Sequence, residues 1–115
     1  MKWGLLAAIN LYDCNSKLIK NKKEIKRFII DLCSLIKMRR FGPARIRRFG
    51  EGKLEGYSAM QFVETSSITL HFDEEKNRAF IDIFSCKDFD SEETEKFCKD
   101  FFKAGKSTKT VLIRD

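Results

Sequence analysis

The side chains that could carry out covalent or acid–base chemistry gather between residues 58 and 86, where a short serine run is followed by a histidine and a cysteine. A serine hydroxyl can act as a nucleophile, a histidine can take up or release a proton, and a thiol can donate one. Taken singly, each has an ordinary alternative: a solvated strand serine, a hydrogen-bonded histidine, a buried cysteine or a hydrated turn carboxylate. Their grouping gives the following candidates: Ser58, Thr65, Ser66, His71, Glu75 and Cys86.

The cysteine and histidine positions argue against a metal site. Cys14, Cys33, Cys86 and Cys98 lie far apart without a CxxC pair, and His71 is the one histidine. Structural zinc sites need several closely spaced ligands of these types, so we expect no metal. Eleven phenylalanines can form an apolar core, and the N-terminus has no signal-like cleavage site. We therefore expect free thiols and a cytoplasmic protein.

The net charge of +6 is unevenly distributed, because residues 17–53 contain 13 basic and 3 acidic residues whereas the remainder is net acidic. A uniformly basic nucleic-acid-binding protein would look different, and no aromatic–basic RNA-recognition motif occurs. We interpret the basic stretch as a solvated helix face and a charged strand edge. Weak RNA binding or capture of an anionic group are the functional alternatives. No apolar run reaches the roughly 20 residues that span a bilayer, so neither nucleic acid nor membrane is expected as a partner.

Hydrophobic periodicity predicts the elements that must position the candidates. Residues 3–12 form an apolar run of strand length, and residues 22–38 have the spacing of an amphipathic helix. Phe41-Gly42-Pro43 should stop that helix. A second helix is predicted to begin at Ser91 with an approximate Ser-x-x-Glu capping box. The aromatic residues that it should direct inward are Phe97, Phe101 and Phe102.

The remaining apolar segments predict an antiparallel sheet. Three glycines in residues 50–56 indicate a loop, and residues 73–77 indicate a turn, so Ser66–Ser85 should be a hairpin. The two helices and about six strands imply one α+β domain over residues 1–115, a two-layer α/β sandwich with both helices on one face of the sheet. The strands besides residues 3–12 are predicted at residues 44–49, 57–64, 66–72, 78–85 and 108–114.

The run VETSSITLHFDEEKNRAFIDIFSC, residues 63–86, resembles the core of the prokaryotic S-adenosylmethionine decarboxylase proenzymes. That family's pattern is roughly ESH-x-x-x-H-T-W-P-E, followed by a strand that ends in D-x-F-T-C. The spacings agree without a gap: five residues from Ser66 to His71, four from His71 to Glu75 and twenty from Ser66 to Cys86. Weaker similarity covers residues 4–14 and 56–58.

The resemblance implies a chain that cuts itself. Ser66 would attack the carbonyl carbon of Thr65, and the resulting ester would eliminate to give fragments 1–65 and 66–115. The new N-terminus would be a pyruvoyl group made from Ser66, a covalent cofactor that forms a Schiff base and spreads the carbanion charge left by decarboxylation. S-adenosylmethionine would be the substrate, and its decarboxylated form would serve spermidine synthesis.

The resemblance also implies a role for each remaining candidate. His71 would assist the elimination, Ser58 would support processing, and Cys86 would return a proton to the product carbon. Glu75 would hold the substrate ribose, since a carboxylate can accept hydrogen bonds from two hydroxyls. Phe49, just before the glycine loop, would stack on the adenine.

Strand geometry adds a prediction about assembly. Five residues of extended strand span about 16 Å, and Ser66 and His71 have opposite parity, so their side chains should lie far apart on opposite faces. We therefore expect a symmetric homodimer in which His71 and Ser58 act on the partner's Ser66 and the partner's Cys86. The family resemblance implies the same arrangement.

The same hairpin predicts which residues meet within one chain. If Phe72 pairs with Arg78 across the turn, Ser66 lies opposite Phe84, and Cys86 then lies near Ser66.

Departures from the family pattern leave alternatives open. Thr65 and Ser67 replace the family's Glu and His, which leaves the scissile carbonyl in place. Asp73-Glu74 replaces Trp-Pro, and Leu6 and Asn10 replace His and Glu in the first strand, all at pocket positions. Arginine or ornithine, whose cationic side chains would suit added carboxylates, is therefore an alternative substrate. The alternative that is not an enzyme is an uncleaved relative that serves as a binding or regulatory subunit.

Overall fold

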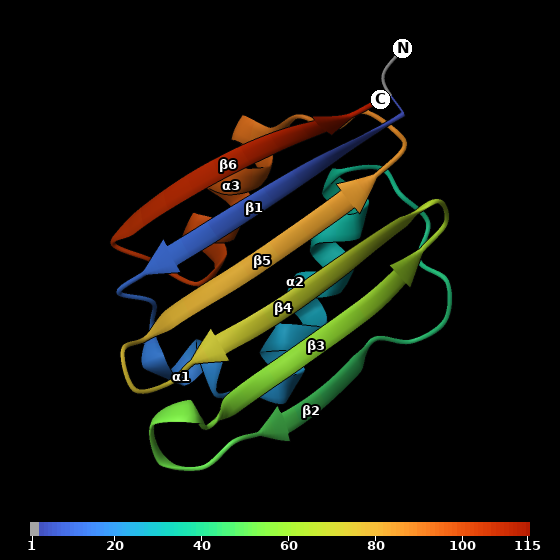
Figure 1. Cartoon of the computed structure of the whole chain (residues 1–115). Coiled ribbons are helices and arrows are strands. Elements are labelled where there is room, and N and C mark those ends of the chain that lie inside the picture. The colour runs from blue at the N-terminus through green and yellow to red at the C-terminus, as the bar shows by residue number, and fades with distance from the viewer. Residues whose placement is uncertain (1–2) are drawn as a thin grey trace.

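A six-stranded antiparallel sheet with helices packed on one face forms the architecture of residues 3–115, the part of the chain that the computed structural model describes (Figure 1). The strand order is β2-β3-β4-β5-β1-β6. The strands are β1 (Gly4–Tyr12), β2 (Arg45–Phe49), β3 (Gly56–Val63), β4 (Ser66–Asp73), β5 (Arg78–Ser85) and β6 (Lys106–Arg114). The helices are α1 (Ser16–Ile19), α2 (Lys22–Leu35) and α3 (Ser91–Phe101), with a 3₁₀ turn η1 (Gly52–Leu54) in the glycine loop. This confirms the predicted two-layer α+β sandwich.

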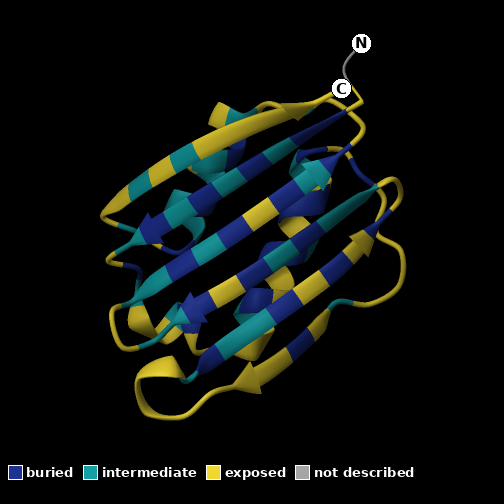
Figure 2. Cartoon of the chain, in the orientation of Figure 1, coloured by how far each residue is buried: buried dark blue, intermediate teal, exposed yellow. Residues whose placement is uncertain are grey.

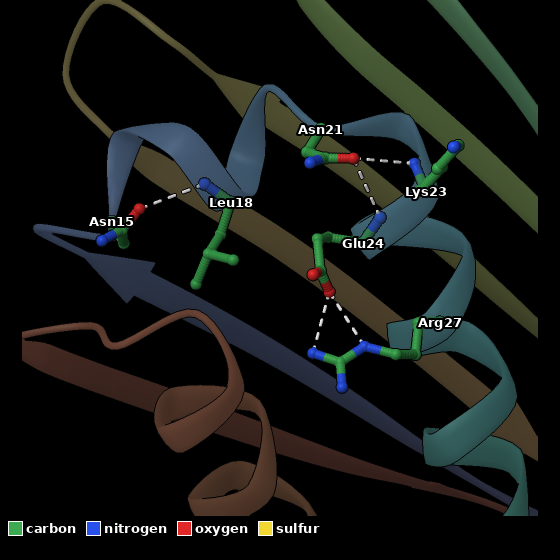
Figure 3. Close-up of polar contacts among 6 residues, drawn as sticks. All are labelled: Asn15, Leu18, Asn21, Lys23, Glu24 and Arg27. Carbon is green, nitrogen blue, oxygen red and sulfur yellow. Dashed lines mark hydrogen bonds and ion pairs between the residues drawn. The ribbon is translucent and has the colours of Figure 1, made fainter.

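The structure has three α-helices rather than the two predicted, because an additional short helix, α1, precedes α2. The side-chain oxygen of Asn15 accepts hydrogen bonds from the backbone N–H groups of Lys17 and Leu18, so the expected turn continues as a short helix. Asn21 caps α2 in the same way (Figure 3). Within the first turns of α2, Glu24 forms an ion pair with Arg27 at 2.8 Å.

Helix α2 ends at Leu35, three residues before the predicted end at Met38. Lys37 adopts a left-handed conformation with φ 57°. The N–H of Met38 donates to the carbonyl of Cys33, and that of Lys37 donates to Ser34. This is a Schellman C-cap formed without glycine, which the apolar spacing could not reveal.

The predicted capping box at Ser91 is wrong, since the residue before it caps α3. The Asp90 carboxylate accepts hydrogen bonds from the N–H groups of Glu92 and Glu93. The inward direction of the aromatic residues is confirmed. Phe102 is fully buried, and the half-buried Phe97 and Phe101 pack with it around the ring of Phe28.

The core lies between the helices and one face of the sheet (Figure 2). Alternate residues of β1, β4 and β5 point at the helices and are fully buried, as Ile9, Leu70 and Ile81 illustrate. No element of the described residues covers the opposite face, and its side chains are half-buried or exposed. No helix in residues 3–115 is long and apolar enough to cross a lipid bilayer.

The β4–β5 register differs from the predicted one by one residue. Phe72 pairs with Ala79 rather than Arg78, so Ser66 lies opposite Ser85 rather than Phe84. The turn is one residue shorter than predicted, residues 74–77, because Asp73 itself continues the ladder opposite Arg78. An ion pair of 2.6 Å between those two side chains stabilises this closure.

The aromatic cluster around Phe28 should dominate the stability of the helix layer. Phe28→Ala removes a fully buried ring and should lower the free energy of unfolding by about 3–5 kcal/mol. Urea denaturation followed by circular dichroism measures this loss. Phe41→Ala, at a ring that is 76% exposed, is the matched control and should change stability little; equal losses in the two variants would contradict the assignment of the core.

Candidate active site

The β3–β4 turn places a residue with a strained backbone conformation directly before Ser66. Val63 and Ser66 pair across a two-residue connection formed by Glu64 and Thr65. Thr65 has φ 63°, in the left-handed region that β-branched residues rarely adopt, at a cost of about 1–3 kcal/mol. Its carbonyl oxygen accepts a hydrogen bond of 3.3 Å from the N–H of Cys86. The carbonyl of the Thr65–Ser66 bond therefore belongs to a residue in a strained conformation and is polarised by a hydrogen bond.

The Ser66 side chain points toward the helix layer and is half-buried. Its hydroxyl lies 2.7 Å from the hydroxyl of Ser85 and 3.4 Å from the sulfur of Met38. Ser85 faces Ser66 across the β4–β5 ladder. The nucleophile candidate thus lies in a partly polar setting at the edge of the core.

Cys86 follows the last residue of β5 and is exposed beside the same turn. It contributes, with Thr65 and Glu64, to a cavity of about 310 Å³ that is also lined by Lys37, Met38, Arg39 and Lys87. Strand pairing therefore brings Thr65, Ser66 and Cys86 together in one chain, as expected from the hairpin despite its shifted register.

Ser58 and His71 form a second group on the other face of the sheet. They pair across β3 and β4, and Ser58 Oγ lies 2.9 Å from His71 Nδ1. Because His71 stands five residues after Ser66, the two groups are about 16 Å apart along β4 and on opposite faces. The structure separates these candidates within one chain, as the strand parity predicted.

Glu75 and Phe49 lie near His71 rather than near Ser66. A cavity of about 360 Å³ between the glycine loop and the β4–β5 turn is lined by Glu75, His71, Leu54 and Phe80, among others. Phe49 lines an adjoining cavity of about 280 Å³ with Ser58 and His71. His71 thus contributes to both hollows, and the proposed substrate residues flank it.

Two features of the site escaped sequence reasoning. Ser85 stands where the family pattern has threonine, one residue before the cysteine, but sequence reasoning gave it no role, and its contact with Ser66 depends on the register. Arg48 forms a bidentate ion pair with Glu74, at 2.6 Å for each bond, and a 2.9 Å bond with Glu55. These hydrogen bonds, that to Glu74 above all, hold the pKa of Arg48 above its usual range. They tie the glycine loop to the β4–β5 turn, the two segments between which the cavity of about 360 Å³ lies.

The carboxylates that replace the family's Trp-Pro pair are neutralised within the chain. Glu74 is held by Arg48, and Asp73 is held by Arg78. By contrast, Glu75 forms no ion pair among the residues that the structure describes and is exposed in the turn.

The four cysteines are free thiols, and burial separates three of them from Cys86. Burial raises the pKa of Cys14 and of Cys33 to about 11, and it raises the pKa of Cys98 further. Residues 3–115 contain no group of three or more His, Cys, Asp or Glu side chains that could hold a metal ion together.

Comparison with known proteins gives a consistent result. The family model described as S-adenosylmethionine decarboxylase matches residues 6–115. Among solved structures, the fold is similar to that of the adenosylmethionine decarboxylase from Aquifex aeolicus VF5, with a TM-score of 0.83 over 98% of this chain and 91% of that chain. The two sequences are 16% identical, so this second match concerns the fold.

The burial pattern predicts selective thiol chemistry. At about pH 8, iodoacetamide should alkylate Cys86 at least about tenfold faster than the three buried cysteines, because Cys86 is exposed and the others remain protonated and shielded. Peptide mass mapping over time measures the rates. Denatured protein is the control and should react at all four positions; comparable labelling of Cys33 in the folded chain would contradict the packing described.

Proposed function

Because the chain belongs to the S-adenosylmethionine decarboxylase family, we propose that it is a cytoplasmic, self-processing, pyruvoyl-dependent decarboxylase that acts on S-adenosylmethionine and supplies the product for spermidine synthesis. The observation that carries this proposal is the β3–β4 turn. There the left-handed Thr65, the Ser66 hydroxyl and the backbone N–H of Cys86 meet at one peptide bond.

Self-cleavage begins with attack of Ser66 Oγ on the carbonyl carbon of Thr65. Negative charge then develops on the Thr65 oxygen, where the N–H of Cys86 already donates a hydrogen bond and can stabilise it. Breaking the peptide bond also releases the strain of the left-handed threonine. The ester then undergoes β-elimination, which releases fragment 1–65 as its carboxylate and leaves a dehydroalanine at the start of fragment 66–115. The imine tautomer of this residue takes up water and loses ammonia, which gives the pyruvoyl group.

The surroundings of Ser66 suit a pyruvoyl group at the start of β4. The Ser85 hydroxyl lies within hydrogen-bond distance of the position, and the cavity of about 310 Å³ beside Thr65 and Cys86 leaves room for a reacting substrate. Such a group withdraws electrons from the substrate carbon that loses carbon dioxide. The exposed thiol of Cys86 would return the proton to that carbon.

Ser58 and His71 would handle protons during processing. The bond between Ser58 Oγ and His71 Nδ1 fixes the imidazole ring, and Nε2, which has no hydrogen-bond partner within residues 3–115, can face a reacting group. Both residues lie about 16 Å along β4 from Ser66 in the same chain. A complete site therefore requires these two residues from a second copy.

The uncovered sheet face supports a homodimer with shared sites. Met60 is 46% exposed and Phe62 is 61% exposed on this face. A row of paired positions runs from Phe62 through Ser67 to the apolar residues Phe84, Leu6 and Leu112. A two-fold packing of these faces would bury that row. The same two-fold packing would place the His71 end of β4 in one copy beside the Ser66 end of β4 in the other. The partner's His71 would then reach the turn at Ser66 around the end of β4.

The residues around the two cavities beside His71 favour S-adenosylmethionine over arginine or ornithine. Glu75, which forms no ion pair within residues 3–115, offers its carboxylate to ribose hydroxyls, and Phe49 offers an exposed ring to the adenine from the adjoining cavity. The two carboxylates that could have held a second cationic group, Asp73 and Glu74, are occupied by Arg78 and Arg48.

Cleavage is directly measurable. Intact mass spectrometry of the purified protein should show fragments 1–65 and 66–115, the second with a pyruvoyl end, because the turn activates this one bond. Ser66→Ala should leave the chain whole, whereas the control Ser67→Ala, whose side chain lies on the other face of β4, should cleave normally. The processed protein should release carbon dioxide from carboxyl-labelled S-adenosylmethionine and not from arginine or ornithine.

A single full-length species of 13.5 kDa that has no reactive carbonyl would reject the enzyme and leave the uncleaved binding subunit as the function.

The shared site predicts complementation between two inactive variants. Neither Ser66→Ala nor His71→Ala should cleave alone, but a co-expressed mixture should cleave the His71→Ala chain, because the Ser66→Ala partner supplies an intact histidine. At most one of the two sites in each mixed dimer can recover. Two purification tags isolate the mixed dimer, and mass spectrometry identifies the cut chain. An isolated mixed dimer with no cut chain would reject the shared site.

A further inference from the structure

Ser85 is the polar side chain in closest contact with the Ser66 hydroxyl, and it is fully buried at the end of β5. Its hydroxyl oxygen accepts a hydrogen bond of 2.9 Å from the backbone N–H of Lys87 and lies 2.7 Å from Ser66 Oγ. The bond from Lys87 fixes the orientation of Ser85. A fixed acceptor in turn restricts the rotamers of Ser66.

The segment from Ser85 to Lys87 therefore contacts both sides of one peptide bond. On one side, the N–H of Cys86 donates to the Thr65 carbonyl; on the other, Ser85 accepts from Ser66. A shift of this segment would displace the carbonyl and the hydroxyl together. The relative placement of the two reacting groups is thus set by three consecutive residues.

Resting on the proposed self-cleavage, we propose that Ser85 is a positioning residue for Ser66, holding its hydroxyl in one rotamer beside the Thr65 carbonyl. In the acyl shift the Ser66 oxygen bonds to the Thr65 carbonyl carbon, the carbon–nitrogen bond breaks, and the hydroxyl proton goes to the Ser66 nitrogen. Ser85 is not consumed, and no outside reactant is needed. Its part is to accept a hydrogen bond from the attacking hydroxyl and to aim that oxygen.

Removal of the Ser85 hydroxyl leaves Ser66 with a weaker acceptor. The remaining neighbour is the Met38 sulfur at 3.4 Å, and a thioether accepts hydrogen bonds poorly. The Ser66 side chain should then sample several rotamers. Cleavage should slow because fewer molecules hold the attacking oxygen in place.

The experiment compares cleavage rates after refolding of freshly synthesised chains, followed by intact mass spectrometry. Ser85→Ala should cleave about tenfold more slowly or worse, the fold-change expected for loss of one orienting hydrogen bond, and Ser85→Thr should restore most of the rate by returning a hydroxyl. Thr94→Val is the matched control. Thr94 is also buried, and its hydroxyl donates to the Asp90 carbonyl in α3, so this variant should lose similar stability and cleave at the parent rate.

A second readout does not require cleavage. In the His71→Ala background, which should remain uncut, three-bond proton couplings of Ser66 should indicate one rotamer with Ser85 present and averaging in Ser85→Ala. A folded Ser85→Ala chain that cleaves at the parent rate, or unchanged couplings, would overturn the proposal. A parent chain that never cleaves would reject the proposed function, whereas the couplings would still decide whether Ser85 holds Ser66.

Discussion

The two-residue period of strand β4 is the constraint from which the rest of the site follows. Ser66 and His71 belong to one strand, yet the five-residue interval gives them opposite faces and a separation of about 16 Å. The helix layer covers the Ser66 face, whereas His71 and Ser58 lie on the uncovered one. A single copy of this sheet can therefore present two half-sites but cannot bring them together, and any chemistry that needs both depends on assembly.

Much of this arrangement could be predicted from residue type and spacing alone. Alternation in residues 66–72 and a polar turn suffice to predict a hairpin, and a hairpin brings Cys86 to the Ser66 end. Register was harder, because it depends on whether Asp73 ends the strand or pairs with Arg78, and the ion pair between them decides this. The contact between Ser66 and Ser85 could not be predicted before that register was known.

The charged residues show a second limit of sequence reasoning. The interpretation of the basic stretch as solvated agrees with the exposed lysines of α2 and with β2 as an edge strand. One member, Arg48, instead links Glu55 and Glu74, which are far apart in sequence. Composition cannot distinguish such a linking arginine from its exposed neighbours Arg45 and Arg47, because the distinction depends on where two loops meet in space.

The strand order has a consequence for a chain cut between Thr65 and Ser66. The first fragment would contribute β1, β2 and β3, and the second would contribute β4, β5 and β6. In the sheet, β1 lies between β5 and β6, and β3 lies beside β4. The strands of the two fragments are therefore interleaved in the sheet. Separating the fragments would require breaking the hydrogen bonds of three strand pairs, β1–β5, β1–β6 and β3–β4. A nick at the turn leaves each ladder whole, and the halves stay joined without any covalent tie.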